Sequence, residues 1–286
     1  MAGKVNLTAA RESDFRRRKR RALGQHFLAS AGVLEKIVAV IDPGENDLII
    51  EIGAGKGALT FPLAEKAGRV VAVEKDPRLA ALLEQKRVPN LVVLAADILD
   101  LSFKTLVRSW SDSDRGAKLV GNLPYSISSP LLFKVIGERV FERCVFLVQK
   151  EVAMRVTSAP GPKDFAPLSI LLQLEYDAAL HFKVAAGSFS PPPRVESALI
   201  SLTKRASPLY PVRDLGLFLE FLRSAFRQRR KTLANNLAAS GRSPGLVGEA
   251  FQELALGAKA RPEQLTIGQF VRLFEFFFPE KPRPSA

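Results

Sequence analysis

Short apolar runs alternate with amphipathic stretches over the first two thirds of the chain. Buried strands are predicted at the short apolar runs, which are residues 47–53, 69–73, 91–94, 118–122, 144–148 and 197–202. Helical spacing of apolar residues predicts helices at residues 31–40, 58–66, from 77 onward and at 129–136. Such alternation is typical of an α/β fold with a mostly parallel, doubly wound sheet, whose ligand lies at the carboxyl ends of the strands.

The last third of the chain has a different pattern. After a linker at 204–211, helical spacing recurs in four stretches, at residues 215–226, 231–239, 246–254 and 266–277. We therefore expect three parts: a basic, flexible extension (1–22), an α/β domain (23–205) and a small all-α domain (206–286).

Charge favours an anionic partner. The 286-residue chain has a net charge of +13, which suits either nucleic acid or an anionic membrane surface. Residues 16–21 are six consecutive cations, typical of a phosphate-binding arm, a solvated tail or an import signal. A second basic cluster beside Phe226 is expected to bind RNA; it comprises Arg223, Arg227, Arg229, Arg230 and Lys231.

The remaining composition bears on membrane insertion, secretion and metal binding. No run of about 18 apolar residues predicts a membrane span, and no apolar secretory core stands at the N-terminus. The single Cys144 cannot form an internal disulfide and lies in an apolar run, so we interpret it as a core residue of a cytoplasmic protein. With only His26 and His181 and no Cys/His pairs, no metal site is expected.

Acids and glycines stand where the predicted strands end. Glu51 precedes the glycine turn 53–57, while Glu74 and Asp97 follow the next two strands. Gly53, Gly55 and Ala58 also satisfy a relaxed dinucleotide pattern, so a nicotinamide enzyme is one alternative. Three carboxylates suit a cationic adenosine derivative better than a pyrophosphate, and S-adenosylmethionine meets that description.

The stretch after the strand 118–122 carries the most specific chemistry. The side-chain oxygen of Asn122 and the carbonyl of Pro124 can accept hydrogen bonds from an exocyclic amine, and Tyr125 offers a face for stacking. These groups predict a site for an unstacked nucleobase, although Asn and Pro are also ordinary turn residues. Phe189, held by the prolines at 191–193, is either a second stacking face or part of a surface turn.

Seven motifs together resemble those of the bacterial 16S rRNA adenine dimethyltransferases, the kasugamycin-sensitivity family. They are L-G-Q-H-F-L (23–28), E-I-G-A-G-K-G-A-L-T (51–60), V-E-K-D (73–76), A-D-I-L (96–99), G-N-L-P-Y-S-I-S-S-P (121–130), F-S-P-P-P-R-V-E-S-A (189–198) and A-F-R-Q-R-R-K-T-L (225–233). His26 stands where the family often has Asn. The resemblance implies a Rossmann-like class I methyltransferase fold, with the methyl donor contacted by His26, Leu28, Gly53, Glu74, Asp97 and Asn122. Glu74 would bind the ribose of S-adenosylmethionine, and Asp97 its adenine amine.

The resemblance also implies a reaction. It is the N6,N6-dimethylation of two adjacent adenosines in a loop near the 3′ end of 16S rRNA, by a monomer acting on the assembling 30S subunit, with Asn122, Pro124, Tyr125 and Phe189 at the target base. Three alternatives stay open: a 23S rRNA resistance methyltransferase, a non-catalytic assembly factor and a dinucleotide oxidoreductase.

Overall fold

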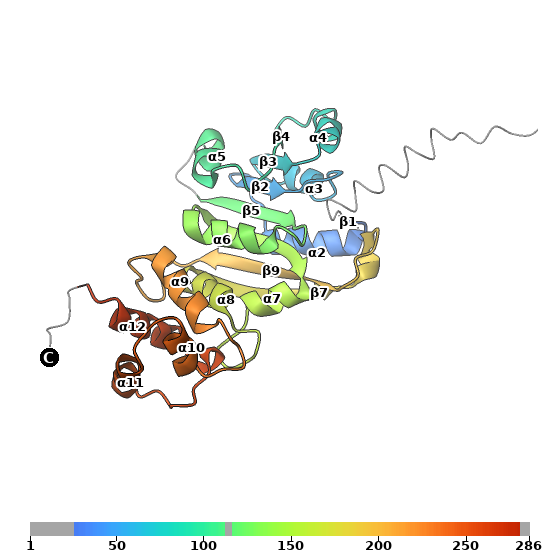
Figure 1. Ribbon diagram of the computed structural model, residues 1–286. Helices are drawn as coiled ribbons and strands as arrows, with labels where there is room; N and C mark the ends of the chain where they lie inside the picture. The colour runs from blue at the N-terminus through green and yellow to red at the C-terminus, as the bar shows by residue number, and fades with distance from the viewer. Residues whose placement is uncertain (1–25, 112–115, 281–286) are drawn as a thin grey trace, which may run out of the picture. The chain divides into compact units, whose positions relative to one another are not determined.

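The structure is a computed structural model that describes residues 26–111 and 116–280 (Figure 1). The basic run 16–21 and the predicted extension 1–22 lie outside these residues. The chain forms two compact units. Unit 1 runs to Lys134 and adds Val140–Lys150 and His181–Ser201; unit 2 contains Val135–Arg139, Glu151–Leu180 and the chain from Leu202 onward. Unit 2 thus joins the helical C-terminal region to two earlier segments.

A mostly parallel sheet forms the centre of the fold. Within the described residues it has seven strands in the order β4-β3-β2-β5-β6-β9-β7, and the pairs β3/β4, β2/β3, β2/β5 and β5/β6 are parallel. The strands are β2 (Leu48–Ile52), β3 (Arg69–Glu74), β4 (Leu91–Ala95), β5 (Ala117–Asn122), β6 (Phe141–Gln149), β7 (Tyr176–Val184) and β9 (Ser197–Lys204). The predicted strands are therefore present, and their ends differ by up to three residues.

Strand order reverses at β2, which has β3 on one side and β5 on the other. Ligands of doubly wound folds bind at such a reversal, beyond the carboxyl ends of the strands. Ile52 pairs with Val73 on β3 and with Gly121 on β5, so the glycine turn, Glu74 and Asn122 leave the sheet side by side. Gly121 permits this close pairing, because a Cβ there would lie 2.6 Å from the Ile52 carbonyl oxygen.

Helices connect the parallel strands of unit 1 (Figure 1). The connecting helices are α3 (Thr60–Ala64), α4 (Pro77–Glu84), α5 (Phe103–Trp110) and α6 (Ser128–Glu138), whereas α2 (Ala31–Ile41) precedes β2. One apolar core joins α2 and α3 to the sheet and contains Ile37, Leu63 and Val120, all under 5% exposed. Asp76 caps α4 by accepting a hydrogen bond from the Arg78 amide, as the Asp-Pro start predicts. Cys144 is fully buried, which confirms it as a core residue.

Several elements are absent from the sequence predictions. The most important is β1 (Phe27–Leu28), which pairs antiparallel with β8 (Phe189–Ser190), so that Leu28 lies opposite Phe189. Two-residue strands carry no periodic signal, so only the folded chain reveals this pair. Helices α5 and α7 (Lys150–Val156) and strand β7 were also not predicted, although β7 does alternate buried and exposed side chains.

Unit 2 is largely helical. Besides α7 it contains α8 (Pro167–Glu175), α9 (Leu215–Ala225), α10 (Leu233–Ala239), α11 (Pro244–Glu253) and α12 (Ile267–Phe277). Phenylalanines form its core, with the rings of Phe218 and Phe274 in edge-to-face contact at 5.1 Å. Neither unit contains, among its described residues, a helix long and apolar enough to cross a membrane.

Candidate active site

The glycine turn after β2 has a backbone that only glycine adopts readily. Gly53, Gly55 and Gly57 have φ angles of 67°, 60° and 85°. A Cβ on Gly55 would lie 2.9 Å from Cε1 of Phe27, so the N-terminal strand lies directly on the turn. The turn therefore offers bare backbone to a ligand, with an aromatic ring beside it.

Glu74 is held rigidly at the end of β3. Its Oε2 accepts the Gly55 amide and its Oε1 accepts the Asp76 amide, each at 2.8 Å, and the side chain is 3% exposed. Each carboxylate oxygen retains a further lone pair, so Glu74 can still accept hydrogen bonds from a ligand diol.

Asp97 lies in the same hollow as Glu74, a cavity of 190 Å³ that also has Lys75 and Ile98 in its wall. Lys75 Nζ donates to Asp97 Oδ2 at 2.6 Å, and the Leu99 amide donates to Oδ1 at 3.0 Å. These bonds, chiefly that from Lys75, lower the pKa of Asp97 below its ordinary value. Asp97 is therefore a carboxylate at neutral pH and can accept a hydrogen bond from an amine.

The amide of Asn122 has a defined orientation. Its Nδ2 donates to the main-chain carbonyl of His26 at 2.8 Å. A carbonyl can only accept, so Oδ1 is turned the other way and remains available as an acceptor. His26 is in turn held by its ring, whose Nδ1 lies 2.8 Å from the Pro191 carbonyl oxygen and must carry the proton.

The carbonyl of Pro124 is already engaged. It accepts the Ile127 amide at 3.1 Å and the Ser128 hydroxyl at 3.2 Å. A carbonyl oxygen has two lone pairs, and the hydroxyl is the partner that can rotate away. An incoming amine would therefore compete with Ser128 for this acceptor.

Next to Asn122 is a small hollow of 40 Å³ bordered by Pro124, Tyr125, His26 and Phe189. The rings of His26 and Tyr125 lie 5.8 Å apart with an interplanar angle of 31°. Phe189 is only 5% exposed, so it forms the floor of this hollow, whereas Tyr125 is half-buried.

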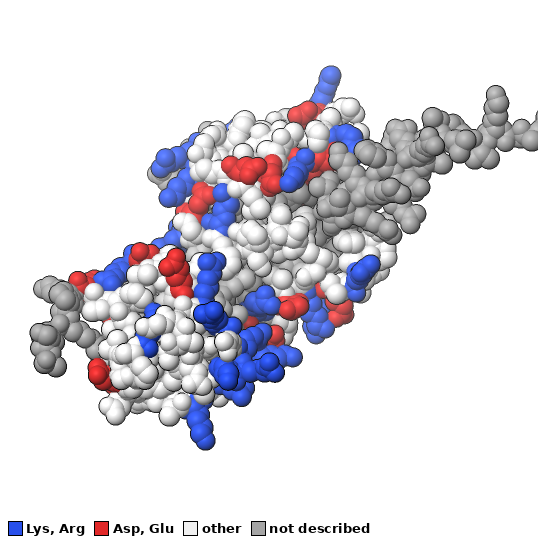
Figure 2. All heavy atoms as spheres, in the orientation of Figure 1, with Lys and Arg blue, Asp and Glu red and all other residues white. Residues whose placement is uncertain are grey.

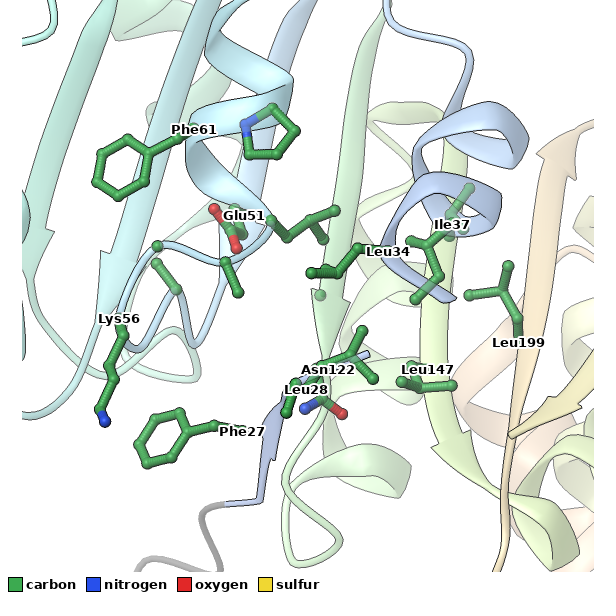
Figure 3. A pocket seen from close by; sticks show the side chains of 18 of the residues that line it. Phe27, Leu28, Leu34, Ile37, Glu51, Lys56, Phe61, Asn122, Leu147 and Leu199 are labelled. Carbon is green, nitrogen blue, oxygen red and sulfur yellow. The ribbon is translucent and has the colours of Figure 1, made fainter. Parts of the chain in front are cut away.

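A third and larger cavity, of 450 Å³, adjoins the first two (Figure 3). Leu28 and Asn122 are among its lining residues, and Glu51 lies within it beneath α3. Phe27 lines all three spaces, and Asn122 lines this cavity and the small hollow. The predicted donor-binding residues therefore line three different spaces. Gly53, Glu74 and Asp97 line the 190 Å³ cavity, His26 lines the small hollow, and Leu28 lines the 450 Å³ cavity.

Comparison with known proteins identifies the family of this chain. The profile of the family described as ribosomal RNA adenine dimethylase matches residues 16–278. The chain belongs to that family. It is 38% identical over 259 residues to the ribosomal RNA small subunit methyltransferase A of Halothermothrix orenii, covering 88% of this chain and 86% of the relative. The corresponding protein of Geobacter metallireducens is 39% identical over 261 residues, covering 90% and 94%.

Two solved structures support the family assignment. A dimethyladenosine transferase from Plasmodium falciparum superposes with a TM-score of 0.74 at 25% identity, covering 87% of this chain and 96% of the other. The 23S rRNA methyltransferase ErmE gives a TM-score of 0.67 at 25% identity, covering 87% and 98%. The Rossmann-like methyltransferase fold with a helical C-terminal region is therefore confirmed. This rRNA adenine dimethyltransferase is an enzyme whose family implies S-adenosylmethionine as the methyl donor, and the dinucleotide oxidoreductase alternative is wrong.

Two residues of this candidate site are absent from the sequence predictions. Phe27 belongs to the segment 23–28, but nothing in the sequence shows that its ring would lie on Gly55. Lys75 follows Glu74 directly, and its contact with Asp97 depends on the pairing of β3 with β4. A lysine at a strand end beside two acids is the signal that could have indicated it.

The predicted RNA-binding cluster lies in unit 2, in and next to the loop between α9 and α10. Arg223, Arg227, Arg229, Arg230 and Lys231 all have exposed side chains. Figure 2 shows Lys and Arg side chains gathered over the part of this unit where Figure 1 draws α8 and α10. Asn236, 1% exposed, holds the loop by accepting the Gln228 amide at 3.0 Å and donating to the Gln228 carbonyl at 3.2 Å.

Proposed function

We propose that this enzyme transfers methyl groups from S-adenosylmethionine to N6 of two adjacent adenosines in a loop near the 3′ end of 16S rRNA, within the assembling 30S subunit. The orientation of Asn122 is the observation that supports this most directly, because the bond from Nδ2 to His26 leaves Oδ1 as a free acceptor on a residue that lines the small hollow beside Tyr125. The choice of 16S rather than 23S rRNA follows relatives named for the small subunit at 38% identity, against 25% for ErmE.

The cavity at Gly53, Glu74 and Asp97 fits the adenosine end of the donor. Glu74 would accept hydrogen bonds from the ribose hydroxyls, and Asp97 would accept one from the adenine amine, because both are carboxylates with free lone pairs. Gly55 keeps the turn bare, since a side chain there would collide with Phe27. When bound, S-adenosylmethionine supplies an electrophilic methyl group on a sulfonium.

The target adenine would be held by three neighbouring groups. Asn122 Oδ1 accepts one N6 proton, and the Pro124 carbonyl accepts the other after the Ser128 hydroxyl rotates away. Tyr125 stacks on the exposed face of the base, and Phe189 forms the floor. Each stack contributes about 1–3 kcal/mol, against a few kcal/mol needed to unstack the base.

These hydrogen bonds align the N6 lone pair for attack on the methyl group. The N–C bond would form as the S–C bond of the donor breaks, and the positively charged N6 would then lose a proton to solvent. Because methylation makes that nitrogen acidic, no strong general base is needed, and positioning supplies much of the rate. The same site admits a monomethylated N6, so two transfers per adenosine are possible.

RNA affinity would come from the cations of the α9–α10 loop and from residues 16–21. Phosphate contacts release counter-ions, so affinity is expected to fall steeply as salt rises. We propose that the enzyme works as a monomer in the cytoplasm and needs no metal.

The deciding experiment measures transfer of labelled methyl from S-adenosylmethionine to unmethylated 30S subunits and, in parallel, to protein-free 23S rRNA, followed by nucleoside analysis. Wild type should form N6,N6-dimethyladenosine in 30S subunits alone, and Asn122→Ala should abolish it. Label only in 23S rRNA would assign the chain to the resistance enzymes. Donor binding without transfer to either RNA would favour an assembly factor.

A further inference from the structure

The 190 Å³ cavity has two walls that the sheet does not join to each other. Residues 96–98, which follow β4, form one wall, and Pro124, Ser126 and Ile127, which follow β5, form the other. In the sheet, β3 and β2 lie between β4 and β5, so no strand pairing connects the two walls directly. Contacts beyond the sheet therefore determine how closely the two walls approach.

Lys134 connects the helix behind one wall to the other wall. It stands on α6, which begins at Ser128 directly after the second wall. Its half-buried side chain donates from Nζ to the Leu99 carbonyl at 3.2 Å. The Leu99 amide donates in turn to Asp97 Oδ1 at 3.0 Å. Leu99 therefore links the position of Lys134 to the position of the Asp97 carboxylate.

An ammonium group suits this place better than a neutral donor does. Lys134 Nζ lies 5.2 Å from the centroid of the Phe103 ring, so a cation–π contact adds to the hydrogen bond. Phe103 is fully buried and its ring packs edge-to-face on Phe141 at 5.0 Å, so the ring is itself held in place. A charged donor also makes a stronger hydrogen bond to a carbonyl than a neutral donor makes.

The helix that carries Lys134 is anchored at its first turn. The Pro124 carbonyl accepts the Ile127 amide and the Ser128 hydroxyl, and the amide of the fully buried Leu131 donates to the Ile127 carbonyl at 2.9 Å. The wall at 124–127 therefore continues into α6 without a break. Lys134 ties the turn at 97–99 to the same helix that holds the turn proposed to bind the target base.

We propose that Lys134 is a positioning residue that holds Asp97 in place and so selects adenine in the methyl donor. It acts from behind the cavity wall, by keeping the turn at 97–99 against α6, rather than by contact with the donor. This inference rests on the proposed function, in which Asp97 accepts a hydrogen bond from the adenine amine. Loss of Lys134 should therefore weaken the preference for adenine more than it weakens nucleoside binding in general.

The test measures, by calorimetry, the affinity of the full chain for two nucleosides. 5′-Methylthioadenosine is the nucleoside part of the donor without its amino acid. 5′-Methylthioinosine has an oxygen in place of the amine, so Asp97 would face an acceptor instead of a donor.

The proteins are wild type, Lys134→Met, Lys134→Gln, Lys134→Arg and Lys66→Met, an exposed control with the same loss of charge as Lys134→Met. Lys134→Gln is a second uncharged variant that decides the matter if Lys134→Met does not fold. Thermal midpoints verify the folding of each protein.

Wild type should bind 5′-methylthioadenosine about 20-fold more tightly than 5′-methylthioinosine, the equivalent of one hydrogen bond to a charged group. Lys134→Met and Lys134→Gln should reduce this preference to about threefold, whereas Lys134→Arg, which keeps the charge, and Lys66→Met should retain most of it. In an Asp97→Ala background, Lys134→Met should change 5′-methylthioadenosine affinity by less than about twofold, because Lys134 acts through Asp97.

The inference is wrong if both uncharged variants prefer 5′-methylthioadenosine as strongly as wild type does. It is also wrong if they lose affinity for the two nucleosides equally, since that is the result of a purely structural role. These outcomes leave the proposed function intact. Failure of wild type to bind either nucleoside would instead overturn the proposed donor site, and this inference with it.

Discussion

The side chain of Asn122 is oriented by the main chain of His26, 96 residues earlier in the sequence, through a hydrogen bond of 2.8 Å. His26 is itself tied to the Pro191 carbonyl, which follows the strand that pairs with β1. Three distant segments therefore determine where the amide oxygen points. The geometry proposed for catalysis therefore depends on the short β1–β8 pair as well as on the N-L-P-Y turn.

Replacing Asn122 by Asp is expected to reduce methyl transfer strongly, although the two side chains have the same shape. The carboxylate has no N–H to donate, so one of its oxygens would face the His26 carbonyl and be repelled. Misplacement of the acceptor should lower single-turnover methyl transfer by about 100-fold. Asn235→Asp, an exposed change, is the control. Transfer within threefold of wild type in Asn122→Asp would contradict the role given to this contact.

Ser128→Ala is expected to strengthen binding of the target base rather than weaken it. The mutation removes the hydroxyl that donates to the Pro124 carbonyl and leaves the Ile127 amide bond in place. The N6 amine would then find a free lone pair, so KM for rRNA should fall by roughly threefold, the equivalent of a weak net hydrogen bond. Initial rates at varied rRNA concentration measure this. A rise in KM with an unchanged thermal midpoint would show that Ser128 assists base binding.

The sequence predicted the sheet well because its strands are short, mostly apolar runs, and Glu74, Asp97 and Asn122 stand at or just after the ends of three of them. It predicted the contacts between these ends poorly. The Lys75–Asp97 pair, the position of Phe27 on Gly55 and the orphan oxygen of Glu51 all depend on strand register or on β1, which is too short to leave a pattern. Local periodicity determines where helices and strands form, whereas the partners of Asp97, Asn122 and His26 lie 22, 96 and 165 residues away.

Lys75→Met tests whether Lys75 keeps Asp97 ionised and oriented in the cavity proposed to bind adenosine. Lys75 keeps the pKa of Asp97 low, so the carboxylate stays ionised down to acidic pH. Without the lysine the pKa should return towards about 4, and loss of 5′-methylthioadenosine affinity on acidification should begin at higher pH. At pH 7 we expect affinity to weaken by about three- to tenfold, because Asp97 loses the partner that orients it. Calorimetry from pH 3.5 to 8 measures this, with exposed Lys66→Met as control.

Asn236→Ala tests whether the basic loop acts in RNA binding. The buried amide makes both hydrogen bonds to the Gln228 backbone, so its loss should let the loop move without removing a charge. rRNA affinity is expected to fall about tenfold, while 5′-methylthioadenosine affinity stays the same. Arg230→Gln should instead reduce the slope of log affinity against log salt by about 0.7. Filter binding at four salt concentrations compares both variants with Asn235→Ala. If Asn236→Ala binds rRNA as tightly as wild type, the loop does not take part in RNA binding.

Glu51 should make stability depend on pH in the direction opposite to most carboxylates. Burial raises its pKa in the folded state to about 7 from an ordinary value of 4.5, so the folded chain binds this proton more tightly than the unfolded chain does. The free energy of unfolding therefore falls as the pH rises from about 4.5 to 7, by about 3 kcal/mol in total for this group. Glu51→Gln cannot ionise, so its stability advantage over wild type should grow across that range and be constant above it. Urea unfolding at pH 5 and pH 8 measures both values, and exposed Glu65→Gln should follow wild type. An equal difference between Glu51→Gln and wild type at the two pH values would mean that Glu51 already has a compensating partner.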